Sequence, residues 1–366
     1  MPTRCLTSMA LAAGLVAAAD GRTIQVPEDA ATIQGAVDLA GPGDRVVVGP
    51  GTWREAVRID GRGLVLESKS GPSRTLIDGS GLSSSVLTVT GSRADSVVIR
   101  GFRVAGGVGD ADRFGPSATI GGGLLVKGAS PLIENCRFSG NVVTYEGGGA
   151  WIGGRAAARF VNCSFTSNRA ERGGGAYVHD SKATFVDCRF MSCIALFAGG
   201  GIVADAASEV TVSDSTFEEC TAAHNGGGIY VYQSGATVER STFLRNSAGR
   251  SGGAIYQGYN AQVEQVDLDF RTFGDSVFGQ WYSSLAGPPK GACCIESVCI
   301  EVTERACHDA GGRWSGADTD CVSVLAAACP IATPGDLNDD AAVDILDVAI
   351  LMSLWGEDPP APATEP

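Results

Sequence analysis

Short apolar runs recur at a fixed spacing between Gly121 and Gln257. Each unit carries a glycine triplet, a short apolar strand, and then a Phe that is followed three residues later by Asn or Cys. The triplets begin at Gly121, Gly147, Gly173, Gly199 and Gly226, and the last unit has Gly252-Gly253-Ala254 instead. Successive steps are therefore 26, 26, 26, 27 and 26 residues. This period, with short runs rich in β-branched and aromatic residues, predicts a β-solenoid.

A second column of residues runs in step with the glycines. It consists of Phe138, Phe165, Phe190, Phe217 and Phe243, followed at three residues by Asn141, Asn168, Cys193, Cys220 and Asn246. Coils of a solenoid lie about 4.8 Å apart and each strand pairs with two neighbours, so equivalent residues form columns. We therefore predict an all-β fold, a right-handed parallel β-helix, with Phe rings stacked in its core and Asn amides bonded between coils.

The two ends of a solenoid expose unpaired strands and need covers. Ile33, Ala36, Val37 and Ala40 share one face of a short predicted helix, which suits a cap on the first coil. A cluster of aromatic residues after the last coil is the predicted cover at the other end: Phe270, Phe273, Phe278, Trp281 and Tyr282. The β-helix domain, with its N-terminal cap helix, is predicted to span residues 20–286.

These columns resemble the repeats of the polymorphic outer membrane proteins, a family of surface β-helices, over about 140 residues. Upstream, the run from Thr32 to Ile59 is similar to the start of pectate-lyase-like right-handed β-helix domains. Both resemblances imply the same fold. The second also implies an architecture that hosts lyases with clustered calcium-binding Asp and a basic Arg, and hydrolases with paired Asp. Neither motif is found in these repeats.

One face of the predicted strands is rich in aromatic residues. Side chains alternate along a strand, so if the residue directly after each triplet points inward, the next points outward. That outward column is Leu125, Trp151, Tyr177, Val203, Tyr230 and Tyr256, with Tyr232 two positions further on the same face. Because aromatic surfaces with polar tips suit sugar rings, we predict that polysaccharide contacts Trp151, Tyr177, Tyr230, Tyr232 and Tyr256. The alternative is that these rings only shield the sheet.

Catalytic residues are not assigned by the sequence. Glu146 and Glu171 come from neighbouring coils, and two carboxyls about 5 Å apart suit a retaining glycosidase, but their columns do not match. His179 and Asp205 lie on the aromatic face and are the other candidates. The insertion from residue 105 to 118 is positioned to form one lip of a groove beside this face.

The N-terminal 19 residues have the layout of a secretory signal peptide, with Arg4, an apolar stretch and then Ala17-Ala18-Ala19. No later apolar run is long enough to span a bilayer, so the mature chain is predicted to be extracellular or on the cell surface. The net charge is −14, from 27 Lys and Arg against 41 Asp and Glu. This balance argues against nucleic acid as a partner.

Residues 287–330 form a predicted cysteine-rich module. Six cysteines crowd into it: Cys293, Cys294, Cys299, Cys307, Cys321 and Cys329. In an exported chain this indicates disulfides, whose pairing the sequence leaves open. The segment resembles short cysteine-rich repeats of large exported bacterial proteins. The cysteines of the repeats, Cys136, Cys163, Cys188, Cys193 and Cys220, are instead expected to be buried thiols.

A calcium loop is predicted within residues 331–358. Positions 1, 3, 5, 7, 9 and 12 of the loop are Asp336, Asn338, Asp340, Ala342 through its carbonyl, Asp344 and Asp347. The loop and the apolar helix-like pattern after it resemble one repeat of a type I dockerin, an EF-hand-like module that docks polysaccharide-degrading enzymes onto cohesins. Ala341 stands where Gly is usual, and the second repeat is missing before the Pro-rich tail at 359–366. The alternative is an acidic soluble tail.

Two functional hypotheses follow. The first is a secreted or cell-surface, non-catalytic β-helix that binds polysaccharide, or displays a surface to envelope proteins, and carries a calcium-binding tail. The second is an extracellular carbohydrate-active enzyme, either a polysaccharide lyase or a glycoside hydrolase, with a cohesin-like partner for the tail. Acidic side chains that converge on the aromatic face would favour the second hypothesis.

Overall fold

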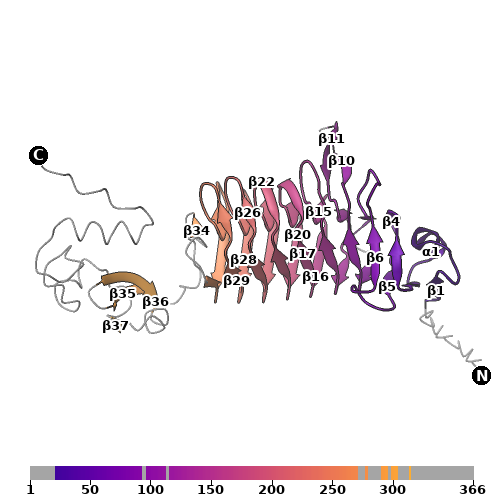
Figure 1. Cartoon of the computed structure of the whole chain (residues 1–366), viewed down its shortest axis with the longest axis horizontal. Coiled ribbons are helices and arrows are strands. Elements are labelled where there is room, and N and C mark those ends of the chain that lie inside the picture. The colour runs from indigo at the N-terminus through magenta and orange to yellow at the C-terminus, as the bar shows by residue number, and fades with distance from the viewer. Residues whose placement is uncertain are drawn as a thin grey trace, which may run out of the picture. The chain divides into compact units, whose positions relative to one another are not determined.

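The structure of the chain is a computed structural model that describes residues 21–92, 96–112, 115–270, 277–278, 290–295, 298–303 and 313–314. It consists of two units, Met1–Ser283 and Ser284–Pro366, which we describe separately. The first unit is a parallel β-helix whose coils stack along one axis (Figure 1). The predicted fold class is therefore confirmed for this unit.

Three long parallel sheets form the walls of the β-helix, and after the first strand of the chain each coil contributes one strand to each sheet. The first sheet contains ten strands: β1 (Thr23–Val26), β2 (Arg45–Val48), β5 (Val65–Ser68), β8 (Val98–Arg100), β13 (Leu132–Glu134), β16 (Ala157–Val161), β20 (Lys182–Val186), β24 (Glu209–Ser213), β28 (Gly235–Glu239) and β32 (Gln262–Val266).

The second sheet carries the Phe column. Its strands are β3 (Gly51–Trp53), β6 (Thr75–Asp78), β9 (Arg103–Ala105), β14 (Arg137–Ser139), β17 (Ser164–Thr166), β21 (Arg189–Met191), β25 (Thr216–Glu218), β29 (Thr242–Leu244) and β33 (Asp269–Phe270).

The third sheet, which we call the aromatic sheet, carries the predicted ligand-binding column. Its strands are β4 (Val57–Asp60), β7 (Leu87–Thr90), β12 (Leu124–Lys127), β15 (Ala150–Gly153), β19 (Ala176–His179), β23 (Ile202–Asp205), β27 (Ile229–Val231), β31 (Ile255–Gln257) and β34 (Val277–Phe278). The register pairs Trp151 with Tyr177, and Tyr230 with Tyr256, so the column runs without a shift between these coils.

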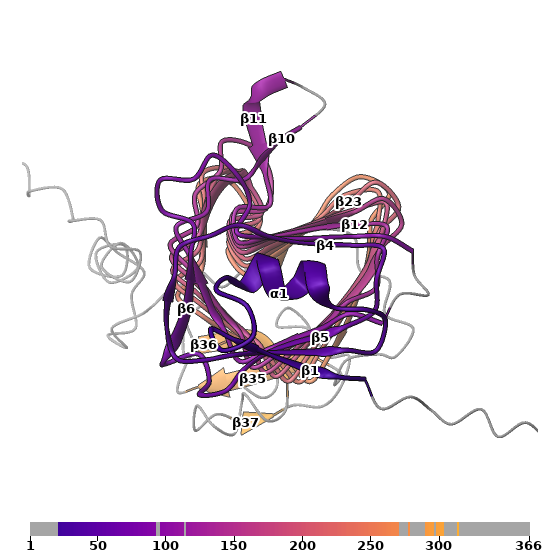
Figure 2. The same cartoon turned by 90° about the vertical axis from the view of Figure 1, so that its right-hand side faces the viewer.

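Two smaller elements stand beside the aromatic sheet. A short parallel sheet precedes the glycine triplets and contains β18 (Arg169–Arg172), β22 (Ile194–Ala198), β26 (Thr221–Ala222) and β30 (Ser247–Ala248). The insertion after β9 contains an antiparallel hairpin of β10 (Asp110–Asp112) and β11 (Gly115–Ile120). Figure 2 shows this hairpin projecting outward from the ring of coils.

The core inside the coils follows the repeat closely. Phe190 is fully buried and stacks on Phe165 and Phe217, with ring centroids 4.7 Å apart on either side. Below this ladder, Asn141 donates from Nδ2 to Oδ1 of Asn168 at 3.0 Å, and Asn168 donates to the carbonyl of Phe138 at 3.0 Å. The predicted Phe stack and Asn bonds are confirmed. The five cysteines of the repeats are buried and free, as expected.

The cap helix, α1 (Ile33–Leu39), closes the first coil (Figure 2). Thr32 accepts a hydrogen bond from the N–H of Gly35, which fixes the first turn. Ile33, Ala36 and Val37 are buried against the coil below, so the predicted face is confirmed. At the other end, Phe270 stacks on Phe243, whereas the side chains of the other predicted cover residues, Phe273, Phe278, Trp281 and Tyr282, lie outside the described residues.

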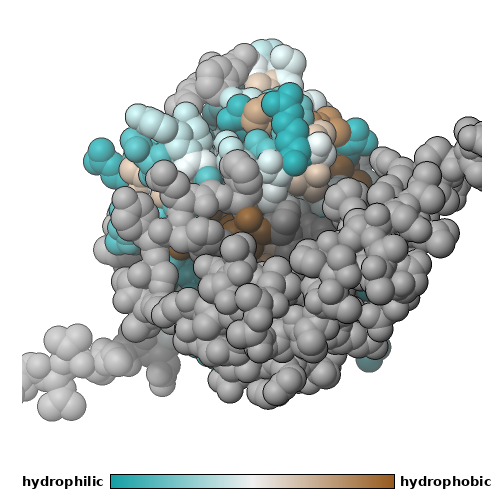
Figure 3. All heavy atoms as spheres, turned by 90° about the vertical axis from the view of Figure 1, so that its left-hand side faces the viewer, coloured by the Kyte–Doolittle hydropathy of each residue, from teal (hydrophilic) through white to brown (hydrophobic). Residues whose placement is uncertain are grey.

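Seen from the end of the coils that carries β34, hydrophilic and hydrophobic residues are interspersed on the surface that is coloured (Figure 3). Within the part of the chain that the structure describes, no helix is long and apolar enough to cross a membrane.

The second unit contains an antiparallel three-stranded sheet of β35 (Lys290–Ile295), β36 (Val298–Thr303) and β37 (Arg313–Trp314). The register places Cys294 opposite Cys299. The other residues predicted to matter in this unit, which are Cys307, Cys321, Cys329 and the calcium loop of residues 336–347, lie outside the described residues, as does the predicted signal peptide.

Candidate functional site

The glycine triplets build a tight turn before each strand of the aromatic sheet. The first glycine of every triplet has φ between 63° and 70°, a left-handed conformation that favours glycine. A Cβ on Gly147 would lie 2.9 Å from the Cβ of Trp151. Because the turn is this tight, the side chain of the residue before the triplet lies over the outer face of the strand that follows the triplet. Glu146 thereby reaches Trp151, and Arg172 reaches Tyr177.

The aromatic sheet has two unlike faces. Its inward residues, such as Leu124, Val126 and Val178, belong to the main core, which confirms the predicted alternation. Outward residues of four of its strands, together with Ile120 of β11, form a second buried cluster: Ile120, Leu125, Trp151, Tyr177 and Val203. The outward side chains of these coils therefore point away from the core but are covered. Tyr177 is only 1% exposed and Trp151 is 8% exposed.

Polar side chains gather on this outer face, and we call the following set the polar centre: Glu146, Arg172, Tyr177, His179 and Asp205. They come from three successive coils. His179 and Asp205 are direct register partners at the ends of β19 and β23. The hairpin of β10 and β11 is close to the centre, because the charge of Asp112 acts on Glu146 and on Tyr145.

Glu146 is the buried acid of the polar centre. It is 7% exposed, and its Oε2 accepts a hydrogen bond of 3.1 Å from Nε1 of Trp151. Burial raises the pKa of Glu146, while the hydrogen bond from Trp151, the nearby hydroxyl of Tyr177 and the charge of Arg172 oppose that rise. The net shift upward favours the protonated carboxyl, which can donate a proton.

Tyr177 links Glu146 to Asp205. Its hydroxyl donates to Oδ2 of Asp205 at 2.8 Å and also contacts the carboxyl of Glu146. Burial and the charges of Glu146 and Asp205 raise the pKa of Tyr177, so this phenol stays neutral. Asp205 accepts a second hydrogen bond through Oδ1 from the N–H of Ala206 at 2.7 Å. Both oxygens of Asp205 are thus held in place.

Arg172 and His179 carry buried atoms without partners. Nε of Arg172 and Nδ1 of His179 are both buried and form no hydrogen bond. The guanidinium of Arg172 lies over the ring of Phe197 at 4.9 Å, and Nε is 3.9 Å from the carboxylate of Glu171. The ring of His179 stacks beside those of Trp151 and Tyr177 at 6.4 and 6.3 Å. Unsatisfied buried polar atoms are rare and call for an explanation.

A second aromatic group lies further along the same face. We call Tyr230, Tyr232, Tyr256 and Tyr259 the tyrosine group. Tyr230 and Tyr256 stack face to face, with centroids 5.2 Å apart and an interplanar angle of 4°. Tyr259 is tilted by 43° against Tyr232 and is 66% exposed. The first three members are partly exposed.

The structure therefore separates the five predicted ligand-binding residues into two places. Trp151 and Tyr177 lie under the polar centre, whereas Tyr230, Tyr232 and Tyr256 lie in the tyrosine group. Sequence reasoning missed Arg172 and Tyr259. Arg172 stands directly before a triplet, and that position would have revealed it. Tyr259 stands in the turn after β31, outside every column.

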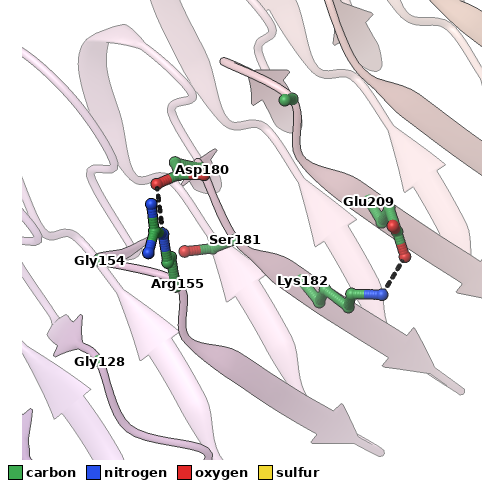
Figure 4. A pocket seen from close by; sticks show the side chains of 8 residues that line it. Gly128, Gly154, Arg155, Asp180, Ser181, Lys182 and Glu209 are labelled. Carbon is green, nitrogen blue, oxygen red and sulfur yellow. Dashed lines mark hydrogen bonds and ion pairs between the residues drawn. The ribbon is translucent and has the colours of Figure 1, made fainter.

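Two hollows lie at other corners of the coils. One, of about 430 Å³, is lined by two ion pairs, Arg155 with Asp180 and Lys182 with Glu209 (Figure 4). The other, of about 640 Å³, is lined by polar groups that include Arg100, Arg137, Arg189, Asn135 and Asn162. Their charged groups are largely paired on the surface, since Arg100 pairs with Glu67 and Arg189 with Glu218.

Two solved structures are similar to this chain at low sequence identity. A pectin methylesterase from Aspergillus niger is 12% identical, with a TM-score of 0.45 over 73% of this chain and 92% of that chain. An alginate lyase from Paenibacillus sp. is 14% identical, with a TM-score of 0.45 over 72% of this chain and 99% of that chain. Among curated proteins, none matches. The family model of the right handed beta helix region matches residues 85–268, so the chain belongs to the right-handed β-helix family.

Proposed function

We propose that this chain is an exported, cell-surface or extracellular β-helix protein that binds a polysaccharide along the outer face of the aromatic sheet. The tyrosine group carries this proposal. Its four rings come from two adjacent coils and their turns, and Tyr259 exposes 66% of its surface. Exposed aromatic residues in a row favour recognition of a ligand over packing.

The ring geometry specifies how a sugar chain would be held. Tyr230 and Tyr256 stack on each other, so each ring covers one face of the other. A phenolic hydroxyl both donates and accepts, which matches the hydroxyls of a sugar. The tilted ring of Tyr259 keeps a face for the apolar side of a sugar ring. We expect Tyr232 and Tyr259 to contribute the most to affinity.

The experiment is retention of the purified chain on an array of immobilised plant, algal and bacterial polysaccharides. Tyr259→Ala and Tyr232→Ala should each lower the affinity for a retained polysaccharide by about 5-fold to 100-fold, which corresponds to about 1–3 kcal/mol for a stacked aromatic contact. Leu196→Ala is the control, because Leu196 is also apolar and 51% exposed but lies on β22. Equal retention of all variants would refute the proposal, and retention of envelope proteins alone would favour surface display.

A second candidate function is that of an extracellular carbohydrate-active enzyme. The observation that favours it is the presence of two carboxyl groups near Tyr177, because its hydroxyl donates to Asp205 and the charge of Glu146 acts on it. Glu171, in contrast, lies beside Arg172 at 3.9 Å and is not linked to Tyr177 by a hydrogen bond. The acid pair to test is therefore Glu146 with Asp205 and not Glu146 with Glu171.

Export and calcium binding are further parts of the proposal. The sequence of the first 19 residues supports export, and N-terminal sequencing of the secreted chain should then begin at Asp20.

The acidic loop that includes Asp336 and Asp347 supports one calcium ion in the tail. Changing both residues to Ala should abolish calcium binding by the full chain in isothermal titration, and unchanged binding would place the ion elsewhere. Cohesin docking is tested by the same pair of changes.

A further inference from the structure

A sharp corner joins the first sheet to the second in successive coils. The residue at the corner has a left-handed conformation, with φ of 50° at Asn135 and Asn162 and 53° at Asp187. These three residues line the hollow of about 640 Å³, together with Pro72 from the loop after β5. Figure 2 shows the corner between β5 and β6 across the coil from β4 and β12 of the aromatic sheet. The hollow is therefore separate from the face that is proposed to bind polysaccharide.

Arginine recurs at the first position of the strands that follow this corner. It is Arg103 in β9, Arg137 in β14 and Arg189 in β21. The register pairs Arg103 directly with Arg137, so two like charges lie on adjacent strands about 4.8 Å apart, which is destabilising. Ser164 and Thr216 occupy the same position in β17 and β25. The fold therefore does not require arginine at this position.

The counter-charges of these arginines differ from coil to coil. The residue placed to pair with each arginine is the third residue of the next strand, and these residues are Ser139, Thr166 and Glu218. Glu218 forms an ion pair with Arg189, whereas Arg103 donates from Nε to Oγ of Ser139 at 3.1 Å. Within the residues that the structure describes, neither Arg103 nor Arg137 forms an ion pair, and both are exposed. Two adjacent guanidinium groups thus lack a carboxylate partner in a chain of net charge −14.

The carboxylates around the hollow do not neutralise Arg137. Glu67 forms an ion pair with Arg100 at 2.5 Å. Asp187 lines the hollow, but its corner lies two coils beyond that of Arg137, which is about 10 Å at the spacing of strands. Glu134 is the register partner of Arg100 and forms no ion pair in the described part of the chain. The charge of Arg137 is therefore available to a ligand.

Neutral hydrogen-bond donors surround Arg137 in the hollow. Asn135, Asn162 and Ser164 line it, and Ser164 is the register partner of Arg137. Asn162 donates from Nδ2 to Oδ1 of Asn135 at 2.5 Å. Because each amide carries two donor hydrogens, donors remain for a ligand after this bond is made. Amide and hydroxyl donors beside a guanidinium group suit the oxygens of an anion.

The hollow runs along the stack of coils. Its lining extends from Arg100 through Arg137 and Ser164 to Arg189, which are three steps between coils, or about 14 Å. This length suits more than one unit of a polymer, so an anionic group on an extended chain fits better than a free ion. The net charge of −14 disfavours nucleic acid, whose closely spaced phosphates repel an acidic protein.

We propose that this corner binds a sulfate or phosphate ester group of an extracellular polysaccharide through Arg103 and Arg137. A carboxylate has two oxygens, which one guanidinium fork can fill. A sulfate or phosphate ester presents three oxygens and can accept from two guanidinium groups at once. Asn135 and Ser164 add neutral donors. The site goes beyond the proposed function, because neither the tyrosine group nor the polar centre contributes to it.

The test compares retention of the purified full chain on one backbone that carries different groups: dextran, carboxymethyl dextran, dextran sulfate and dextran phosphate, at equal ionic strength. The wild type should bind the sulfate or the phosphate form at least about 10-fold more tightly than the carboxymethyl form. Arg103→Gln and Arg137→Gln should each weaken that binding by about 10-fold to 100-fold. Arg155→Gln is the matched control, because Arg155 lines the other hollow and pairs with Asp180 at 3.6 Å, and its binding should be unchanged.

A substitution that keeps the charge separates a specific site from attraction by net charge. Arg137→Lys retains the positive charge but loses the planar fork, so it should also weaken binding to the ester, by about 10-fold. The sulfate and phosphate arms show which of the two esters the site prefers. Melting temperatures should stay at the wild-type value, because the substituted side chains are exposed. Should Arg137→Gln fail to fold, Arg103→Gln provides the same comparison.

Three results would overturn the inference: equal binding of the carboxymethyl form, equal loss in Arg155→Gln and Arg137→Gln, or unchanged binding in Arg137→Lys. Binding of neutral polysaccharides through the tyrosine group is measured in the same variants and should not change. Conversely, Tyr259→Ala should leave binding of the sulfate or phosphate form unchanged. Failure of this site and failure of the proposed function are therefore told apart.

Discussion

The interior of the β-helix and the outer face of its aromatic sheet belong to the same coils, but they follow the repeat to different degrees. Inside, every coil repeats nearly the same residue, as in the stack of Phe165, Phe190 and Phe217. Outside, one position changes from Leu125 to Trp151, Tyr177 and Val203 in successive coils. Packing restricts the interior to one solution, whereas the outer face tolerates variation. The variable face is therefore where chemistry can be placed.

The largest effect is expected from breaking the interior. Phe190→Ala removes a fully buried ring between two stacked neighbours, and should lower the free energy of unfolding by about 3–5 kcal/mol. Denaturant unfolding of the full chain measures it. A loss below about 1 kcal/mol would mean that the coils repack locally, and the contrast between the two faces would then lose its basis.

A smaller loss is expected at the turn that joins the two faces. Gly173→Ala places a Cβ 2.4 Å from the carbonyl oxygen of Ala176 at a φ of 66°. We expect a loss of about 1–3 kcal/mol from the backbone conformation alone. Gly235→Ala is the matched control, because its added Cβ would be 4.0 Å from the nearest atom, and its stability should be unchanged or slightly higher. Equal effects at both glycines would contradict the description of the turn.

The smallest effect concerns the pH dependence of the outer face. The pKa of Glu146 is raised above its usual 4.5, so the folded state binds this proton more tightly than the unfolded state. The stabilising contribution is complete below pH 4.5 and disappears as the pH rises through the higher folded value. The melting temperature of the wild type, relative to Glu146→Gln, should therefore fall as the pH rises from 4 to 8. A constant difference would show that Glu146 is not held as the acid.

The sequence predicts the interior well because equivalent residues occupy equivalent places. The glycine and Phe columns predict the coils of the β-helix, the inward and outward alternation along each strand, and the burial of the thiols of Cys163 and Cys188. In each case the reason is that the packing of one coil is repeated by the next.

The outer face is less predictable, because its contacts depend on side-chain length and on the turn. The left-handed glycine folds Glu146 over Trp151, which covers residues that alternation alone places at the surface. Tyr177 is long enough to reach Asp205 of the next coil with its hydroxyl, on which the charge of Glu146 from the preceding coil also acts. No periodic pattern contains that information.

The central claim is that the polar centre serves function and not the fold. The most direct test replaces the polar groups by apolar groups of similar size, with Glu146→Leu in one coil and Arg172→Met and Tyr177→Phe in the next. We predict that this variant melts at or above the wild-type temperature, since replacing buried polar groups by apolar ones of similar volume is often stabilising, while its behaviour on the polysaccharide array, in retention or in release of product, differs from that of the wild type. Melting far below the wild type would contradict the claim and make the centre a structural network.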